Sequence, residues 1–257
     1  MSKCIHSVGR VVAFSAAVFL AGQSASAGIT HRYSFTEPGK AKDSVGKLDG
    51  VLKNAAQVAN GKLTLANEDK TSGDEKVSYL EFPSSLLPAG KTVSLVVWFA
   101  AGEQGNFSRV LDIGAQDGGD GSAFIYFTPR NGDDQARVAI SRSDAAGKTA
   151  IDVDRLDNGS PHMIAIVIDG EKKTIQLFID GKSEKPSENL GENTLDSVRP
   201  QHTWLGRSGF DNDAGFTGSI EEFRVYDNAL TADEIAQMQK DGPDKTAAVP
   251  STQPASK

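Results

Sequence analysis

The chain has 257 residues and carries 34 acidic against 27 basic side chains, which gives a formal charge of -7 at pH 7. This acidic balance argues against nucleic acid or an anionic lipid surface as the main partner, because both attract basic proteins. The length admits one large all-β domain or two small ones. Cys4 is the only cysteine, so stability has to come from a packed core rather than from an internal disulfide.

Residues 1–27 have the pattern of a secretory signal peptide. Two basic residues precede an apolar run, residues 11–21, that is too short to span a bilayer. The small residues Ala25-Ser26-Ala27 then form a cleavage site, so we expect a mature chain that begins at Gly28 and has a formal charge of -9. This predicts a secreted, periplasmic or cell-surface protein with no membrane insertion after cleavage, and an uncleaved anchor is the alternative.

Short apolar segments separated by turns fill the middle of the chain. We predict strands at 31–35, 61–66, 77–82, 92–99, 109–114, 123–127, 136–141, 149–153, 162–168, 174–179 and 203–207. Segment 92–99 is apolar on both faces, which predicts a central strand of a packed sheet. Segments 162–168 and 174–179 predict a hairpin around the turn at Asp169-Gly170. Strands at this spacing without long helical patterns are typical of a sandwich or a barrel.

The segment 218–226 predicts a long strand near the end of the chain. Strict alternation cannot place Ile220, Phe223 and Val225 on one face, because 220 and 223 differ by an odd number. An extra residue at Glu221-Glu222 would bring all three inward. The pattern therefore predicts a β-bulge at this position.

A short helix and a polar tail follow this strand. Thr231 and Glu234 have the spacing of a capping box, which predicts the start of a helix. Residues 242–257 consist of proline, small and polar residues without apolar periodicity. They predict a disordered tail.

This closing segment resembles the end of a LamG-like (laminin G, concanavalin A-like) jelly roll domain, where G-x-I-D/E-E-V-R-I-Y precedes N-x-A-L-S/T-x-x-E-I. The matching residues are Gly218, Ile220, Glu221, Glu222, Phe223, Arg224, Val225, Tyr226, Asn228, Ala229, Leu230, Thr231, Glu234 and Ile235. Segments 33–35 and 92–99 are similar to other strands of the family. The resemblance implies an all-β fold: a single concanavalin A-like jelly roll β-sandwich over residues 28–241, with a short C-terminal helix.

The sequence lacks the motifs of the main catalytic classes. Glucanases of this architecture carry E-x-D-x-E or E-x-D-x-x-E on one strand, where the period of two brings the carboxylates to one face, and neither motif occurs here. The histidines are scattered without zinc-ligand spacing, and neither a nucleophile elbow nor a phosphate loop is present. We therefore expect a protein that is not an enzyme.

Calcium is the one cofactor that the resemblance implies, at a structural site between the first loop and the closing strand. Carried over to this sequence, its ligands would be Asp43, the Gly46 carbonyl, Asp49 and Glu222. Calcium binds six to eight oxygen atoms, so carboxylates and turn carbonyls suit it. The alternative is equally open: a carboxylate in a turn whose oxygens accept hydrogen bonds from backbone amides.

A glycan-binding surface would need aromatic faces for stacking and polar groups for the hydroxyls. Trp98 and Trp204 lie within predicted strands, and we expect them to pack in the core. Loop residues are better candidates: Phe107, Arg109, Arg130, Arg142, Arg207, Phe210, Asp211 and Asn212.

The first functional hypothesis is an exported, non-catalytic binding module that recognises a carbohydrate or another polar extracellular ligand, with a structural calcium ion as an option. The alternative is a structural or adhesive envelope protein that binds other proteins. A glycan hydrolase or lyase is the third reading, and it needs paired carboxyl groups in a cleft. Paired carboxyls, exposed aromatics with arginine, or a flat apolar patch on the sandwich would discriminate among the three.

Overall fold

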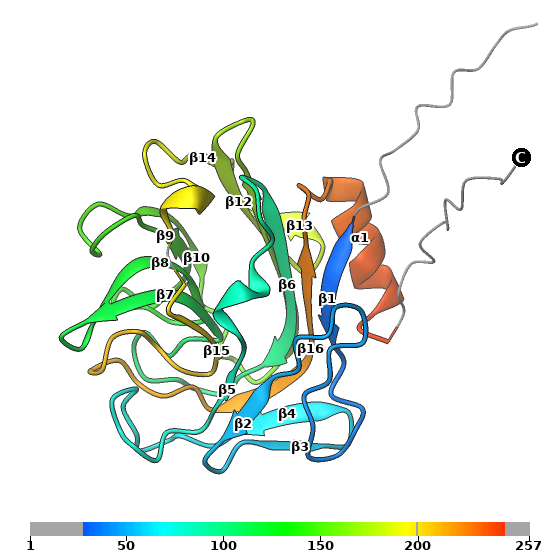
Figure 1. Ribbon diagram of the computed structural model, residues 1–257, viewed down its shortest axis with the longest axis vertical. Coiled ribbons are helices and arrows are strands. Elements are labelled where there is room, and N and C mark those ends of the chain that lie inside the picture. Colours follow the sequence, from blue (N-terminus) through cyan, green and yellow to red (C-terminus); the bar gives the residue numbers. More distant parts are fainter. Residues whose placement is uncertain (1–27, 199, 245–257) are drawn as a thin grey trace, which may run out of the picture.

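The alternating segments form two antiparallel sheets that stack face to face (Figure 1). The computed structural model describes residues 28–198 and 200–244. The expected signal peptide, and residues 245–257 of the expected tail, lie outside the described residues. In the described ranges the chain is mostly strand, as the sequence predicted.

One sheet contains nine of the described strands and the other contains seven. The nine-stranded sheet has the order β13 (Lys182–Ser183), β12 (Thr174–Ile179), β11 (Pro161–Asp169), β6 (Val93–Ala100), β16 (Gly218–Tyr226), β4 (Lys62–Leu65) and β3 (Gln57–Ala59), with β1 (Ile29–Tyr33) paired to β16 and β14 (Glu188–Asn189) paired to β12. The seven-stranded sheet has the order β10 (Thr149–Asp154), β9 (Gln135–Ile140), β8 (Asp120–Thr128), β7 (Leu111–Asp117), β15 (His202–Leu205), β5 (Tyr79–Glu81) and β2 (Val51–Lys53). The pattern did not predict β2, β3, β13 and β14, which are too short to show a period.

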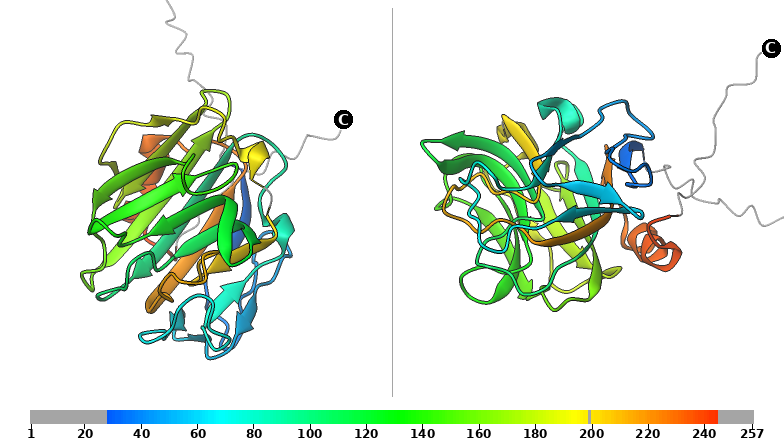
Figure 2. Two further views of the ribbon diagram at one scale, coloured as in Figure 1. Left: turned by 90° about the vertical axis from the view of Figure 1, so that its left-hand side faces the viewer. Right: turned by 90° about the horizontal axis from the view of Figure 1, so that it is seen from below.

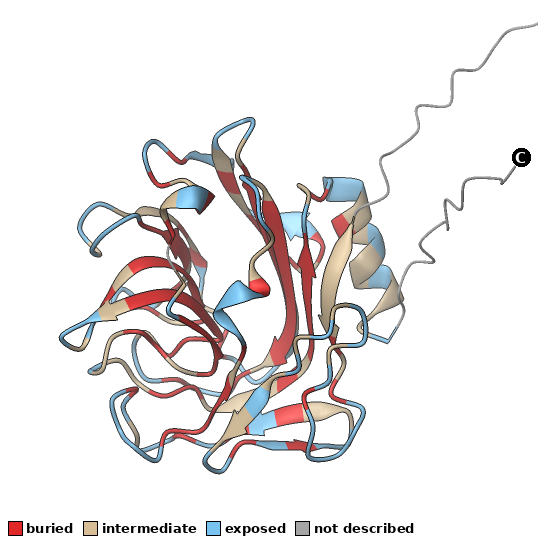
Figure 3. Ribbon diagram, viewed as in Figure 1, coloured by how far each residue is buried: buried red, intermediate tan, exposed pale blue. Residues whose placement is uncertain are grey.

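The main core lies between the sheets and consists of alternate residues of the facing strands. The buried segments of these strands are red in Figure 3. Tyr33 of β1 anchors one end of it. Its ring centroid lies 4.5 Å from that of Phe82 and 6.0 Å from that of Phe223. The Tyr33 hydroxyl donates a hydrogen bond to the carbonyl of Leu48, so burial of this polar tip is compensated.

Strand β6 is buried on both faces, as its composition predicted. Val97 and Phe99 point into the core between the sheets, whereas Val96 and Trp98 point to the outside of the nine-stranded sheet. Helix α1 (Ala232–Asp241) covers that outer face and buries Ile235 completely. The right view of Figure 2 shows the helix against the sheet.

The closing strand β16 contains the predicted bulge. Ile220 pairs with Phe99 and Glu222 pairs with Trp98, so two steps on β16 match one step on β6. As a result Ile220, Phe223 and Val225 all lie in the inner core. Glu222 is left on the outer face, where its carboxylate needs partners.

The predicted capping box opens helix α1. The Thr231 hydroxyl accepts a hydrogen bond from the Glu234 amide, and the Glu234 carboxylate accepts one from the Thr231 amide. The helix stops at Gly242, whose φ is 76°. None of the helices in the described ranges has the length and hydrophobicity needed to cross a lipid bilayer.

Candidate functional site

A pocket of about 170 Å³ opens on the outer face of the seven-stranded sheet. Strands β7 to β10 of this sheet, in green, face the viewer in the left view of Figure 2. Its lining combines aromatic rings with charged side chains. The lining residues are Phe107, Arg109, Tyr126, Arg137, Ala145, Lys148, Phe210 and Asp213.

Strand β8 supplies the floor of the pocket by simple alternation. Ile125 and Phe127 point into the core between the sheets, so Phe124 and Tyr126 point outward. The loop after β15 lays Phe210 across this face, with its ring 5.9 Å from that of Phe124. Gly121 makes room for it, because a Cβ at that position would lie 2.5 Å from the Phe210 ring.

Phe107 forms another wall of the pocket. Its backbone φ is 61°, in the left-handed region that a residue with a Cβ seldom adopts, at a cost of about 1–2 kcal/mol. Its amide donates to the carbonyl of Arg130, which holds the loop against the end of β8. A strained aromatic residue in a pocket wall is a frequent sign of a functional site.

Arg109 lies beneath the rings. It is 2% exposed, and its guanidinium carbon stands 3.6 Å from the centroid of the Tyr126 ring. Its Nη2 lies 3.0 Å from a carboxylate oxygen of Asp213. Among the described residues its Nε and Nη1 atoms have no hydrogen-bond acceptor, and buried donors of this kind require explanation.

Two carboxylates support Arg109, one at its Nε and one at its Nη2. Asp112 is buried, lies 2.9 Å from Nε2 of His202 and accepts a hydrogen bond from the Gly209 amide. The Oδ2 atom of Asp112 also lies 3.5 Å from Nε of Arg109. Asp213 accepts a hydrogen bond from Ser208, and burial raises the pKa of its carboxyl group although Arg109 opposes that shift.

The structure brings together only part of the predicted glycan-binding set. Arg109, Phe107 and Phe210 meet in the pocket, and Asp211 and Asn212 continue the same loop. Asp211 accepts a hydrogen bond from Gln116, and Asn212 is exposed.

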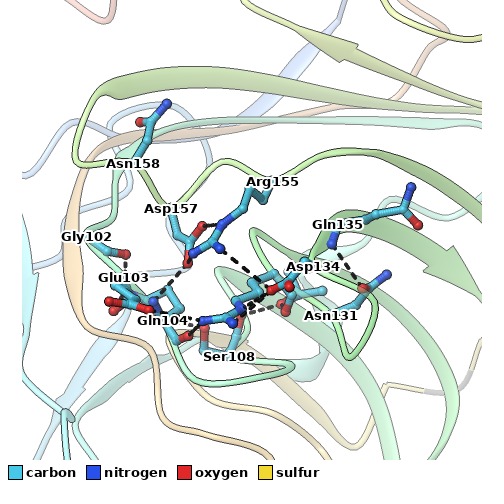
Figure 4. Close-up of polar contacts among 12 residues, drawn as sticks. Gly102, Glu103, Gln104, Ser108, Asn131, Asp134, Gln135, Arg155, Asp157 and Asn158 are labelled. Atoms are coloured by element: carbon cyan, nitrogen blue, oxygen red, sulfur yellow. Dashed lines mark hydrogen bonds and ion pairs between the residues drawn. The ribbon is translucent and has the colours of Figure 1, made fainter.

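Three predicted arginines lie elsewhere. Arg207 stacks on Trp204, with its guanidinium carbon 4.6 Å from the ring centroid, and Arg142 pairs with Glu192. Arg130 belongs to a polar loop cluster with Gln104 and Asp134, which are labelled in Figure 4. There it donates to the Gln104 carbonyl and to Asp134, so its main donors are already engaged.

The same cluster shows how the loops beside the pocket are fixed. Gln104 donates from its side chain to the Thr217 carbonyl and accepts from the Thr217 amide and the Ser108 hydroxyl. Asp157 accepts from the Gln104 amide and pairs with Arg155 (Figure 4). These contacts hold the loop that carries Phe107 and Arg109.

The residues predicted for calcium lie in two separate arrangements. The Asp43 carboxylate is fully buried and lies 2.7 Å from His31 Nδ1. It accepts hydrogen bonds from the backbone amides of residues 32, 45, 46, 47 and 48. Burial opposes its ionisation, but the His31 contact and these amides lower the pKa of Asp43 below its ordinary value. This is the turn carboxylate that the sequence left open as the alternative.

Gly46 contributes its amide, not its carbonyl, to the Asp43 turn. A Cβ at this position would lie 2.4 Å from the Asp43 carboxylate, so the close approach requires glycine. Asp49 accepts from the Asp43 amide and pairs with Lys42.

Glu222 lies between two arginines on the outer face of the nine-stranded sheet. It accepts hydrogen bonds from Arg32 Nε at 2.8 Å and Nη2 at 2.9 Å, and from Arg224 Nε. The three predicted carboxylate ligands therefore already face N–H donors, and this arrangement does not fit a calcium ion. Within residues 28–198 and 200–244 no three acidic, histidine or cysteine side chains gather in a way that would hold a metal. Calcium binding stays a prediction.

Sequence reasoning missed five pocket residues: Tyr126, Arg137, Ala145, Lys148 and Asp213. Tyr126 had a signal, because it occupies an outward position of a predicted strand next to core residues. No sequence signal indicated Lys148, since only the packing of its loop against β8 and β9 brings it to the pocket.

Solved structures with the same fold include binding domains. The chain is similar to domain 4 of AbnA, a GH43 extracellular arabinanase from Geobacillus stearothermophilus, in complex with arabinotriose (18% identity, TM-score 0.57, 83% of this chain and 99% of that chain covered). It is also similar to the Ruminococcus gnavus IT-sialidase CBM40 (16% identity, TM-score 0.54, 74% of this chain and 98% of that chain covered). A third similar structure is the binding domain of botulinum neurotoxin DC in complex with rat synaptotagmin II (8% identity, TM-score 0.60, 83% of this chain and 51% of that chain covered). At these identities the likeness concerns the fold.

No curated protein matches the chain in sequence. A family model does: that of the concanavalin A-like lectin/glucanases superfamily, of the laminin G type, matches residues 74–236. The matched range contains the pocket and the closing strand, and it spans more than half of the chain. The chain therefore belongs to the concanavalin A-like lectin/glucanase superfamily.

Proposed function

We propose that this protein is an exported, non-catalytic carbohydrate-binding module that holds a sugar in the pocket on the seven-stranded sheet. One observation carries the proposal. Three aromatic rings, Phe107, Tyr126 and Phe210, surround a buried arginine that keeps unpartnered N–H groups within the described residues.

The chemistry of the pocket suits a sugar. The C–H faces of a pyranose ring pack on aromatic side chains, and its hydroxyls need fixed polar partners. Arg109 offers donors that are already desolvated and held in place by Tyr126 and Asp213. Little side-chain freedom is lost on binding, and preorganisation of this kind raises affinity.

The distribution of carboxylates supports binding without cleavage. Glycoside hydrolysis needs two carboxyl groups, about 5 Å apart in retaining and about 6.5–9.5 Å apart in inverting enzymes. Of the described residues that line the pocket, Asp213 is the one carboxylate. Asp112 is not among these lining residues, and its carboxylate is engaged with His202 and the Gly209 amide.

The similar structures support the same reading. The arabinanase domain was solved with arabinotriose and the sialidase module with sialyllactose, and this chain covers almost the full length of both. A protein partner is the second candidate, since the neurotoxin binding domain holds synaptotagmin II. Among the described residues, however, Val45 and Val51 are the only large apolar side chains that are well exposed, which leaves little apolar surface for a protein interface.

A glycan array with the purified chain tests the proposal. We expect binding to at least one glycan, and a loss of about tenfold or more in Phe210→Ala, because the ring forms a wall of the pocket and not part of the main core. Arg142→Ala is the control, since that side chain is 57% exposed and lies outside the pocket. Binding that Phe210→Ala leaves intact, in a variant with an unchanged melting temperature, would refute the proposed site.

Export has a separate test. We expect the N-terminal residue of the protein recovered from outside the cytoplasm to be Gly28, as the cleavage site predicts. A mature protein that begins at Met1 would show that the signal is not cleaved.

A further inference from the structure

We propose that the sugar bound in this pocket bears a carboxylate, and that Arg109 and Lys148 receive it. The inference rests on the proposed glycan binding and adds the chemical class of the ligand. It follows from the charges at the pocket and from the hydrogen-bonding state of two cations.

Arg109 is the first of these cations. Its side chain is 3% exposed and lines the pocket, with the Tyr126 ring 3.6 Å from its guanidinium carbon. One edge of the guanidinium faces Asp213 at 3.0 Å, whereas Nη1 has no acceptor among the described residues. A guanidinium N–H with no acceptor suits a carboxylate better than a hydroxyl, because its hydrogen bond to an anion is charge-assisted on both sides.

Lys148 is the second. It lines the same pocket, and its Nζ donates to the Ala145 carbonyl at 2.9 Å. In the described part of the chain no carboxylate lies within ion-pair distance of it. By contrast Arg137, the third cation of the lining, is already bound by Asp152 through two nitrogens. Lys148 therefore carries a charge that the fold does not neutralise.

The charge at the pocket differs from that of the whole chain. The chain has 27 basic and 34 acidic residues, whereas the described lining has three basic residues and one acid. That acid, Asp213, faces Arg109, and burial raises the pKa of its carboxyl group, which weakens its opposition to an anion. Arg109 is compensated by Asp112 and Asp213, and Arg137 by Asp152, so the positive charge left at the lining is that of Lys148, which favours an anionic ligand.

The size of the pocket limits how much of a glycan enters it. A volume of about 170 Å³ is below the ~300–1,000 Å³ of drug-sized sites. It corresponds to roughly five or six water molecules at ~30 Å³ each, so we expect one terminal sugar acid to enter. The rest of the glycan would lie along the loop of Asp211 and Asn212.

Matched pairs of ligands test the inference by calorimetry on the full chain. The pairs are 4-nitrophenyl β-glucuronide and β-glucoside, the corresponding galacturonide and galactoside, and sialyllactose and lactose. Within each pair only the acidic member carries a carboxylate. We expect at least one acidic member to bind about tenfold or more tightly than its neutral counterpart, and its affinity to fall with added salt.

Lys148→Gln should remove most of that preference, so that the acidic and the neutral member of a pair bind with similar affinity. The control is Lys172→Gln, on the hairpin of the other sheet, where the lysine is 78% exposed. Equal binding of acidic and neutral members would overturn the carboxylate inference and leave glycan binding standing. Binding to none of the ligands and to no glycan on the array would overturn both.

Discussion

Two buried arginine clusters on opposite sheets use the same residue types in different ways. The closing-strand cluster consists of Arg32, Glu222 and Arg224, and the pocket cluster consists of Arg109, Asp112 and Asp213. In the first cluster both arginines bind one carboxylate, and both also donate to the carbonyl of Pro243. In the second cluster one arginine faces two carboxylates and keeps donors that the described protein does not use.

The difference separates a stabilising network from a ligand-facing one. The closing-strand cluster joins β1, β16 and the segment after helix α1, so its hydrogen bonds add to the stability of the fold. The pocket cluster leaves Nε and Nη1 of Arg109 without a hydrogen-bond acceptor among the described residues, in a side chain that lines the pocket. Mutations in the closing-strand cluster should therefore lower stability and leave binding unchanged, whereas mutations in the pocket cluster should lower binding most.

The largest loss of stability is expected from Glu222→Gln. The change leaves two guanidinium groups next to each other without a counter-charge, in a site where Glu222 is 1% exposed, and should cost about 3–5 kcal/mol in the free energy of unfolding. Urea denaturation measures this loss. Glu221→Gln is the matched control, because Glu221 pairs with Lys62 at the surface and should change stability by less than about 1 kcal/mol. A loss no larger than in the control would contradict the role of the closing-strand cluster, and glycan binding by the folded variant should be unchanged.

The next largest effect is expected from Asp43→Asn, which should destabilise the fold by about 2–3 kcal/mol at neutral pH. The amide places two donors against a ring of backbone N–H groups. Because the pKa of Asp43 is lowered in the fold, its contribution is present above its unfolded pKa of about 3.9 and is lost as the pH falls through the folded value.

Unfolding curves of wild type and Asp43→Asn should therefore converge on acidification. Asp49→Asn provides the comparison, since its carboxylate is 45% exposed and pairs with Lys42 on the surface. A difference between wild type and Asp43→Asn that stays constant down to pH 2 would speak against the proposed role of the Asp43 charge.

A loss of stability similar to that of Asp43→Asn, together with the largest loss of binding, is expected from Arg109→Gln. The change leaves the carboxylates of Asp112 and Asp213 without their buried cation, although both keep their other hydrogen bonds, so the free energy of unfolding should fall by about 3 kcal/mol. Binding of any acidic glycan should disappear. Denaturation and calorimetry on the same preparation measure both effects, and retained binding would show that Arg109 has only a structural role.

The smallest effect is expected from removal of divalent ions. Because Asp43, Asp49 and Glu222 already face protein donors, EDTA should shift the melting temperature by less than about 1 °C. Scanning calorimetry with EDTA and with added calcium checks this. A clear rise in melting temperature on adding calcium would restore the original prediction of a calcium site.

Much of the architecture was predictable because it depends on local patterns. The two-sided apolar composition of β6 indicated its central place, and the odd spacing of Ile220 and Phe223 indicated the bulge that the pairing with β6 confirms. Thr231 and Glu234 indicated the start of helix α1 in the same way. Four of the five described strands of two or three residues escaped prediction, since such strands form only where a neighbouring strand offers hydrogen bonds.

The candidate site was predictable only in part. Phe210 and Arg109 were chosen for their residue type and loop position, and the fold brings them together. Arg130 and Arg207 were chosen by the same criteria, but the fold gives them partners elsewhere. Residue type shows what a side chain can bind, and it does not show which other side chains lie within reach.

The sequence by itself determined the class of fold, the bulged closing strand and the capped helix, because each follows from spacing within a few residues. Only the tertiary structure decided that Asp43 binds a ring of backbone amides, that Glu222 bridges two arginines, and that Lys148 reaches Arg109's pocket. These outcomes depend on contacts between residues up to 190 positions apart, as between Arg32 and Glu222. Such contacts exist only when two sheets have closed around one core, and no local pattern encodes them.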